Sequence, residues 1–570
     1  MVISTLVALT ALVPGPWSSR NLPPEERAKA LLSNMTLEEQ LLMLHGPAKR
    51  PTAQCWPMKP ECAYVGNVAP NTRLGIPPIT MNDGPQGFRA PDKLGGTSTA
   101  WPSGLTIAAS WDVAAVEEWG RGMGKEFYAK GSNIQLGPGL CLARVPRNGR
   151  NFEYISGEDP FLGYTLVQPA IKGIQSQGVI ANAKHWVLNN QETNRGAVYE
   201  IASERVRFEL YYRPFAGAIA AGVGSVMCSY NKVAGDKWSC ENPETLGRDL
   251  KELLGFKGFV MSDWGATHST SIGAGLDVEM PGAKFMNGSI VAAAIASGSV
   301  KPQQVSESVL RILTPMFETG VMDAPDGTWS YKKQLINTTT DASVASARRL
   351  SASSTVLLKN AGVLPLAANL RIAVIGFAAA ENAVVHAGGS GSVVPSYITP
   401  PLDGIRAAAG ASAVVRYDNG SDATRAAALA RDSDVSILFV QTLSGEGRDR
   451  DGLSLDLGCK GACHEQNALV SAIAHANAKS VVVMSVPGAV LTPWRHEVGS
   501  LLTNFMPGQA AGDAIADVLF GKVNPSAKLP LTFPASANQT RLTPHQWPGW
   551  PLPKIPTYAN YTEELLIGYR

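Results

Sequence analysis

Residues 258–264 read Gly-Phe-Val-Met-Ser-Asp-Trp, and this stretch decides the fold. Its apolar run, Phe259 to Met261, is followed closely by the carboxylate of Asp263 and the indole of Trp264, with no turn residue between these two. Such a run is typical of a buried strand, and β/α barrels hold reactive groups rigidly at strand ends of this kind. The alternative is that Asp263 only caps the helix that follows the strand.

Similar short apolar runs recur between about residues 75 and 285, each followed by a small polar loop and then by helical spacing. This alternation predicts a parallel α/β layout, and its length suits a (β/α)8-like (TIM) barrel. A doubly wound sheet would require a glycine-rich turn after the first strand, and no GxGxxG is found there. The predicted strand runs are residues 78–81, 134–136, 179–183, 224–227, 258–261 and 275–278.

A second α/β unit follows between about residues 345 and 535. Its predicted strands are residues 372–376, 414–417, 435–440, 481–486 and 501–505. Before the barrel, residues 24–45 show helical spacing with Thr36 as a second helix cap. The predicted segments are 1–20 (N-terminal segment), 21–320 (barrel), 321–345 (polar linker), 346–535 (second α/β domain) and 536–570 (C-terminal extension).

The composition is that of a soluble globular protein with several cores. The chain has 570 residues, and 49 Lys and Arg balance 47 Asp and Glu, so no basic excess indicates a nucleic-acid partner. Residues 1–13 are apolar but too short to span a bilayer, and no later segment predicts a membrane span. The N-terminal run resembles the apolar region of a secretory signal, although no Lys or Arg precedes it, so we expect a secreted protein.

Cysteines and glycosylation sequons add to the expectation of secretion. Three pairs of cysteines lie close together in the sequence, and each is plausible as a disulfide; Cys141 is left over as a buried thiol. The clustered spacing of a zinc site is absent. The pairs are Cys55 with Cys62, Cys228 with Cys240, and Cys459 with Cys463. The sequons begin at Asn34, Asn287, Asn337, Asn419, Asn538 and Asn560, which predicts a glycoprotein.

The polar residues that follow the barrel strands suit a neutral sugar. Asp83 can accept hydroxyl protons, and Lys184, His185 and Arg195 form a cluster of donors. One alternative is a phosphate site, but there is no glycine-rich phosphate loop and the acids are as frequent as the bases. Another is that Asp83 belongs to a common Asp-Gly-Pro turn.

Asp263 and Trp264 together also suit carbohydrate chemistry. An indole ring can lie against a pyranose face while the neighbouring carboxylate meets the anomeric carbon.

Five motifs in order resemble glycoside hydrolase family 3, and specifically its β-glucosidase branch. They are DGPQGFR, GRNFEYISGEDP, KHWVLNNQETNR, VMCSYNKV and GFVMSDW. The resemblance extends from about residue 25 to residue 535 and implies a (β/α)8-like barrel followed by an α/β sandwich, with no metal or cofactor. Many members also have a fibronectin-like third domain, which we expect to be absent from residues 536–570.

The resemblance also assigns roles to individual residues. Asp263 matches the catalytic nucleophile, and Glu446, in the loop LSGEGRDR at residues 443–450, matches the general acid/base. Other acids near Glu446 are alternatives for that role, namely Asp449, Asp451 and Asp456. The residues that match substrate-binding positions are Asp83, Arg89, Arg150, Lys184, His185, Arg195, Met227, Tyr230, Trp264 and, in the glycine-rich loop 388–392, Ser392.

The implied activity is that of a retaining, exo-acting β-D-glucosidase that acts on oligosaccharides or β-glucosides. Such a mechanism requires an ionised Asp263, with a pKa depressed by nearby cations and Tyr230, and a protonated Glu446 with a raised pKa. The alternatives are a β-xylosidase of the same family, a transglycosylase and a non-catalytic sugar-binding protein on the same fold. Asp83 favours glucose because a short carboxylate leaves room for the hydroxymethyl group.

Overall fold

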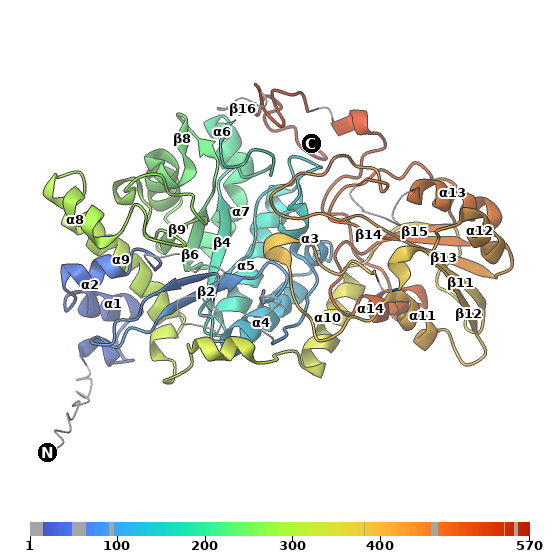
Figure 1. The fold of residues 1–570 in the computed structure, drawn as a ribbon, viewed down its shortest axis with the longest axis horizontal. Helices are drawn as coiled ribbons and strands as arrows, with labels where there is room; N and C mark the ends of the chain where they lie inside the picture. The colour runs from blue at the N-terminus through green and yellow to red at the C-terminus, as the bar shows by residue number, and fades with distance from the viewer. Residues whose placement is uncertain are drawn as a thin grey trace, which may run out of the picture.

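The chain forms a barrel-like part followed by an α/β sandwich, which lie side by side in Figure 1 as the blue-to-green and the orange-to-red halves. A computed structural model of the protein describes residues 15–47, 64–89, 96–380, 382–457, 465–540, 542–551 and 557–570.

Within those ranges, the barrel-like part is built on a six-stranded sheet in the order β1-β2-β3-β4-β6-β9. β1 runs antiparallel to β2, and the remaining neighbours are parallel. Five of the six predicted runs lie in these strands. Their bounds are β1 (Gly66–Val68), β2 (Ile79–Asp83), β3 (Ile134–Leu136), β4 (Ile180–Trp186), β6 (Ser225–Cys228) and β9 (Phe259–Ser262).

The prediction of a sixth strand at residues 275–278 was wrong. Val278 makes only an isolated parallel bridge with Met261. The reason is that the Val260 amide bonds to a side chain at this point and not to a backbone carbonyl of a neighbouring strand. The Oδ2 atom of Asp277 accepts that hydrogen bond at 2.8 Å.

Helices cover the outside of the sheet, and the neighbours α4 and α5 pack against each other in parallel, with Gly120 against Ala170 and Gly124 against Ile174. The predicted helical segment 24–45 is two helices, and Thr36 caps the second through a capping box with Glu39. The bounds are α1 (Pro24–Leu32), α2 (Leu37–Leu42), α3 (Gly104–Ala108), α4 (Val113–Ala129), α5 (Pro160–Gln175), α6 (Glu204–Val206), α7 (Arg213–Ala220), α8 (Gly288–Ala296) and α9 (Pro302–Glu318), with π-helical turns at η4 (Arg207–Tyr211) and η6 (Pro243–Leu253).

The second sheet has the order β10-β15-β14-β13-β11-β12. Its five predicted strands are present and parallel, and β10, which was not predicted, pairs antiparallel with β15 at one edge. The bounds are β10 (Val356–Asn360), β11 (Arg371–Ile375), β12 (Val414–Asp418), β13 (Val435–Gln441), β14 (Ser480–Ser485) and β15 (Ser500–Thr503).

Helices cover both faces of this sheet and make it a three-layer sandwich. Ile405 and Ile515 pack with one set of strand residues, whereas Ala426 and Ile473 pack with the alternate set. This is expected because successive side chains of a strand point to opposite faces. The helices are α10 (Asp341–Ser353), α11 (Pro401–Ala408), α12 (Ala423–Arg431), α13 (Gln466–Ala476) and α14 (Ala511–Leu519).

The two parts are joined by α3 and by the C-terminal segment. Leu105 of α3 is buried in the core of the second sheet, and Thr106 Oγ1 donates to the Met506 carbonyl at 2.9 Å. The C-terminal strand β16 (Thr557–Asn560) returns to the barrel side and pairs with β5 (Val198–Ile201). A small sheet results in the order β16-β5-β7-β8, with β7 at Lys232–Val233 and β8 at Lys237–Trp238.

None of the helices in the described ranges has the length and apolar character that crossing a bilayer would require.

Candidate active site

A cavity of about 460 Å³ lies at the carboxyl ends of the barrel strands and is closed on one side by loops of the sandwich. This is the position where β/α barrels carry their functional loops. Apart from Arg195 and Ser392, all the predicted site residues line it. The lining residues are Tyr64, Val65, Asp83, Arg89, Arg150, Lys184, His185, Met227, Tyr230, Asp263, Trp264, Pro281, Ser390 and Glu446.

Neighbouring parallel strands bring the barrel residues together. Asp83 ends β2, Lys184 and His185 lie near the end of β4, and Met227 lies in β6. Asp263 follows the last residue of β9. Because the carboxyl ends of parallel strands meet at one edge of a sheet, residues 180 positions apart in sequence share one cavity.

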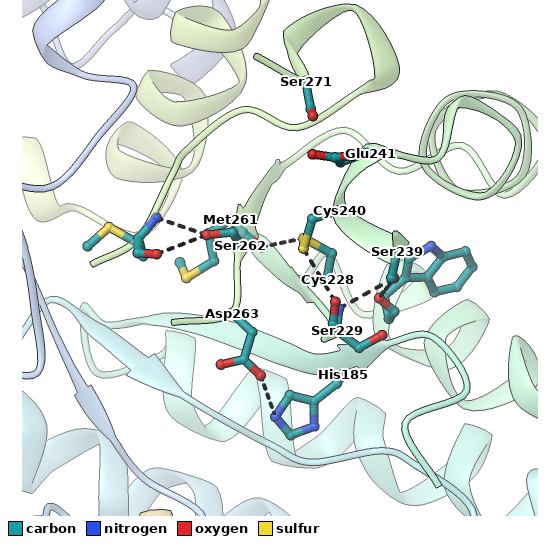
Figure 2. Close-up of a disulfide and its surroundings, with 12 residues drawn as sticks. His185, Cys228, Ser229, Ser239, Cys240, Glu241, Met261, Ser262, Asp263 and Ser271 are labelled. Atoms are coloured by element: carbon teal, nitrogen blue, oxygen red, sulfur yellow. Dashed lines mark hydrogen bonds and ion pairs between the residues drawn. A yellow bond between two sulfur atoms is a disulfide. The ribbon is translucent and has the colours of Figure 1, made fainter. Parts of the chain in front are cut away.

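Asp263 is almost fully buried, with 6% of its surface exposed. Its Oδ1 accepts a hydrogen bond from the Trp264 amide at 2.7 Å. Its Oδ2 has no hydrogen-bond partner among the described residues and lies 3.6 Å from His185 Nε2. Figure 2 shows these two side chains pointing toward one another. One carboxylate oxygen is therefore held by the backbone, and the other is available at the cavity.

Glu446 comes from the opposite side, in the sandwich loop that follows β13. Its Oε2 accepts hydrogen bonds from the Ser390 amide at 3.0 Å and from Ser390 Oγ at 2.5 Å. Its Oε1 accepts one from Arg195 Nη2 at 3.0 Å and lies 3.6 Å from Arg150 Nη1. Two carboxyl groups from different parts of the fold thus face one cavity.

The surroundings of the two carboxyl groups shift their pKa values in opposite directions. Burial raises the pKa of Asp263, although Arg150 acts against this. Burial also disfavours ionisation of Glu446, but the charges of Arg150 and Arg195 and the Ser390 hydrogen bond hold its pKa well below the usual range. The expected directions, a depressed pKa for Asp263 and a raised one for Glu446, were therefore wrong. The reason is that the Asp263 side chain is the more deeply buried of the two, whereas Glu446 lies against both Arg150 and Arg195 and accepts hydrogen bonds from Ser390.

His185 does not supply a positive charge to Asp263. Burial, with the charges of Arg150, Lys184 and Arg195, holds the pKa of His185 well below its ordinary value. The imidazole is therefore neutral, and it lies beside Asp263 as a polar contact only.

Several charged side chains of the cavity are held in place by partners. Arg89 Nη1 donates to Asp83 Oδ2 at 2.8 Å, and Arg150 Nη2 donates to Glu153 Oε1 at 2.6 Å. Lys184 is 2% exposed. Such a set of fixed donors and acceptors suits the hydroxyl groups of a sugar, which both donate and accept.

Two aromatic side chains complete the cavity wall. Trp264 is half-buried, and its Nε1 donates to the Val65 carbonyl at 2.8 Å, which fixes the ring orientation. The guanidinium of Arg195 lies over the Tyr230 ring, 4.6 Å from its centroid.

Some site residues differ from the prediction. Ser390 lines the cavity, in the same glycine-rich loop as Ser392, which does not. Arg195 is outside the lining but bonds to Glu446. Sequence reasoning missed Tyr64, Val65 and Pro281, because no motif connects them with the strand ends.

Two glycines allow the sandwich loop to approach the barrel. A Cβ atom on Gly149 would lie 2.0 Å from the Arg448 carbonyl oxygen. Gly389 has φ +77°, and a Cβ atom there would lie 2.4 Å from the Cβ of Glu446. Both positions therefore require glycine for Glu446 to reach the cavity.

The Cys228–Cys240 disulfide lies next to the strand that leads to Asp263 (Figure 2). The Cys228 carbonyl accepts a hydrogen bond from the Asp263 amide at 3.2 Å. This predicted pair is confirmed, as is the buried free thiol of Cys141. The other two predicted pairs, Cys55 with Cys62 and Cys459 with Cys463, lie outside the described residues.

The comparisons with known proteins agree with this fold. The family model for the glycosyl hydrolase family 3 N terminal domain matches residues 61–314, and that for the C-terminal domain matches residues 355–569. A probable beta-glucosidase L of Emericella nidulans is 36% identical over 541 residues, which cover 89% of this chain and 71% of that protein.

Solved structures are also similar. One is DesR, a beta-glucosidase from Streptomyces venezuelae in complex with D-glucose, with a TM-score of 0.85 at 29% identity over 95% of this chain and 82% of that chain. Another is a beta-D-glucoside glucohydrolase from Trichoderma reesei, with a TM-score of 0.83 at 33% identity over 96% of this chain and 77% of that chain. The fold and the cavity therefore define a carbohydrate-cleaving enzyme, a glycoside hydrolase. The chain belongs to glycoside hydrolase family 3.

Proposed function

We propose that this glycoside hydrolase is an exo-acting β-D-glucosidase that releases terminal non-reducing β-D-glucosyl residues with retention of configuration. The observation that carries the proposal is that Asp263 and Glu446 reach one cavity from two different domains. Relatives named beta-glucosidases match most of the chain, which supports the glucose specificity.

In the proposed first step, Asp263 Oδ2 attacks the anomeric carbon and the bond from that carbon to the leaving oxygen breaks. Glu446 gives its proton to the leaving oxygen. In the second step Glu446 takes a proton from water, the water oxygen bonds to the anomeric carbon, and Asp263 leaves as a carboxylate. Retention requires the two carboxyl groups to lie about 5–5.5 Å apart with substrate bound.

The remaining residues of the cavity would hold the glucosyl ring. Asp83 with its partner Arg89, Arg150 and Lys184 present charged groups to the hydroxyls, and Trp264 offers a fixed ring face. The volume of about 460 Å³ is in the lower part of the range of roughly 300–1,000 Å³ for small-ligand sites, as recognition of a chain end requires.

The test is release of p-nitrophenol from p-nitrophenyl β-D-glucoside, with the β-D-xyloside measured in parallel. We expect turnover of the glucoside to dominate, and proton NMR of the first product to give β-D-glucose before mutarotation. Dominance of the xyloside would contradict the substrate, and α-D-glucose as the first product would contradict retention. Folded protein inactive on both would contradict the proposed function.

A further inference from the structure

A third carboxyl group, that of Glu192, lies behind the cavity and lines no part of it. Its side chain is 0% exposed. Its Oε2 accepts hydrogen bonds from the Gly447 amide at 2.7 Å and from Arg195 Nη1 at 2.8 Å, whereas its Oε1 has no hydrogen-bond partner among the described residues. Burying a carboxyl group in this way is costly, and both of its partners flank Glu446.

Arg195 is shared between two carboxyl groups. One terminal nitrogen donates to Glu192 and the other donates to Glu446 Oε1 at 3.0 Å. The guanidinium is fixed from a third direction by the Tyr230 ring. Because its planar fork carries one positive charge, that charge stabilises the ionised form of each acid less when the other acid is also ionised.

We propose that Glu192 is the positioning residue of Glu446: it fixes the Gly447 amide next to the acid/base and shares the charge of Arg195, so that Glu446 keeps the proton that it gives to the leaving oxygen. This inference rests on the proposed function and concerns the same site. With Glu192 ionised, the charge of Arg195 is offset and Glu446 is more basic. With Glu192 neutral, the whole charge acts on Glu446 and favours its ionised form.

Other ionisable groups surround the pair and act on both members. Burial raises the pKa of Glu192 to about 7, while the pKa of Glu446 is held low. Two acids that are coupled through one arginine titrate as a pair, and at a pH between their two pKa values they hold a single proton between them. In the productive form that proton is on Glu446. The groups that act on one or both of the pair are Arg150, Tyr154, Lys184, Tyr230, Asp263 and Asp449.

The test is Glu192→Gln, which keeps an oxygen acceptor for the Gly447 amide and removes the charge. The kcat of wild type and variant is measured against pH on cellobiose, whose leaving group needs a proton, and on 2,4-dinitrophenyl β-D-glucoside, whose leaving group does not. On cellobiose, we expect the alkaline limb of the kcat–pH profile to lie about one pH unit or more lower in the variant than in wild type. At the optimum, turnover of the dinitrophenyl glucoside changes by less than about threefold.

Two further variants separate charge from structure. Glu192→Asp keeps the charge but shortens the reach to Gly447, so its alkaline limb stays in place while kcat on cellobiose falls. Glu209→Gln, which removes an exposed carboxylate outside the site that pairs with Arg205 at 2.7 Å, is the control and leaves both substrates unaffected.

Equal losses on both substrates in Glu192→Gln, with an unmoved alkaline limb, would overturn the inference and leave Glu192 as a packing residue. The same limb shift in Glu192→Asp as in Glu192→Gln would also overturn it. A wild-type protein inactive on both glucosides would overturn the proposed function itself, which is a distinguishable result.

Discussion

Asp263 and Glu446 differ in what surrounds them, and this decides what each can do. Asp263 has one oxygen bonded to a backbone amide and lies beside a neutral imidazole. Glu446 accepts hydrogen bonds at both oxygens, from Ser390 and from Arg195. A carboxylate with a free oxygen at the cavity suits attack on carbon, whereas a carboxyl with charged partners suits proton exchange.

Replacing Asp263 by alanine should abolish hydrolysis, because the other described carboxylates that line the cavity, Asp83 and Glu446, are each paired with an arginine. We expect kcat on p-nitrophenyl β-D-glucoside to fall by about 10⁴-fold or more. The melting temperature of the variant, measured by calorimetry, checks that the fold persists. Residual activity above about 1% of wild type would exclude Asp263 as the nucleophile.

Replacing Glu446 by alanine should affect substrates according to their leaving groups. Turnover of cellobiose should fall by about 10³-fold, and that of the dinitrophenyl glucoside should fall much less. Azide should restore turnover of the activated substrate and yield β-glucosyl azide, detected by NMR. Equal losses of turnover on the two substrates, without rescue by azide, would indicate that Asp449, Asp451 or Asp456 is the general acid/base.

Gly389→Ala should displace Glu446 because the added Cβ would lie 2.4 Å from the Cβ of Glu446. Gly362→Ala is the matched control: its φ is +83° and a Cβ there meets nothing within 4 Å. Both variants carry a backbone cost of about 1 kcal/mol, but only Gly389→Ala should lower kcat on cellobiose, by about 10-fold or more. Similar kinetics for the two variants would show that Glu446 tolerates the displacement.

At the scale of elements, burial decides what was predictable. Parallel strands covered on both faces appear in the sequence as continuous apolar runs, and Val435–Gln441 is buried throughout. β10 was missed because it is a partly exposed edge strand, and β16 because its partner, β5, lies more than 350 residues earlier. Asp83, Lys184 and His185 could be recognised because they follow such runs, whereas Glu446 and the loop at residues 388–392 came from the family resemblance, which named Ser392 where Ser390 lines the cavity. Tyr64 was missed because it belongs to no motif and reaches the cavity from a loop.

Asp449 ties three loops together, although no motif argument gave it this role. Its oxygens accept hydrogen bonds from the amides of Gly149 (3.3 Å), Glu192 (2.9 Å) and Thr193 (3.1 Å), and from Trp547 Nε1 (3.0 Å). The loop that carries Glu446 is thereby fixed to the barrel and to the C-terminal segment.

Asp449→Asn should therefore reduce stability and activity together. The amide has one acceptor oxygen for four donors, so we expect the free energy of unfolding to fall by about 2–4 kcal/mol, measured by denaturant titration. The kcat on cellobiose should also decrease, because Glu446 loses its fixed position. Unchanged stability in the variant would show that the amide satisfies these donors as well as the carboxylate does.

At the scale of the whole molecule, the C-terminal segment connects the two domains. Composition predicted several domains, and the apolar runs predicted their classes, but residues 536–570 showed no core period in the sequence. Their contacts with the barrel are specific: the Arg144 guanidinium lies 3.5 Å from the centroid of the Tyr561 ring, and Arg144 also forms an ion pair with Glu563. Secretion and glycosylation stay predictions.

Glu200 makes the attachment of this segment sensitive to pH. It lies in β5, opposite Ala559 of β16, it is 1% exposed, and its carboxyl group lies near Tyr561 and Arg144. Burial raises its pKa from the ordinary 4.5 to about 8, with Arg144 acting against this. The folded protein holds this proton at neutral pH and the unfolded chain releases it. The contribution of Glu200 to the free energy of unfolding is thus fully present below about pH 4.5, and it is lost as the pH rises toward about 8.

Glu200→Gln should remove the decrease in unfolding free energy that Glu200 causes as the pH rises, because the glutamine side chain has no carboxyl proton to release. Between about pH 5 and pH 8, the unfolding free energy of the variant should gain about 3 kcal/mol relative to wild type. Calorimetric melting at both pH values measures the difference. Glu252→Gln, at an exposed glutamate of η6, is the control and should parallel wild type. Parallel pH profiles for wild type and Glu200→Gln would mean that Glu200 is ionised in the folded protein and that Arg144 neutralises it at this junction.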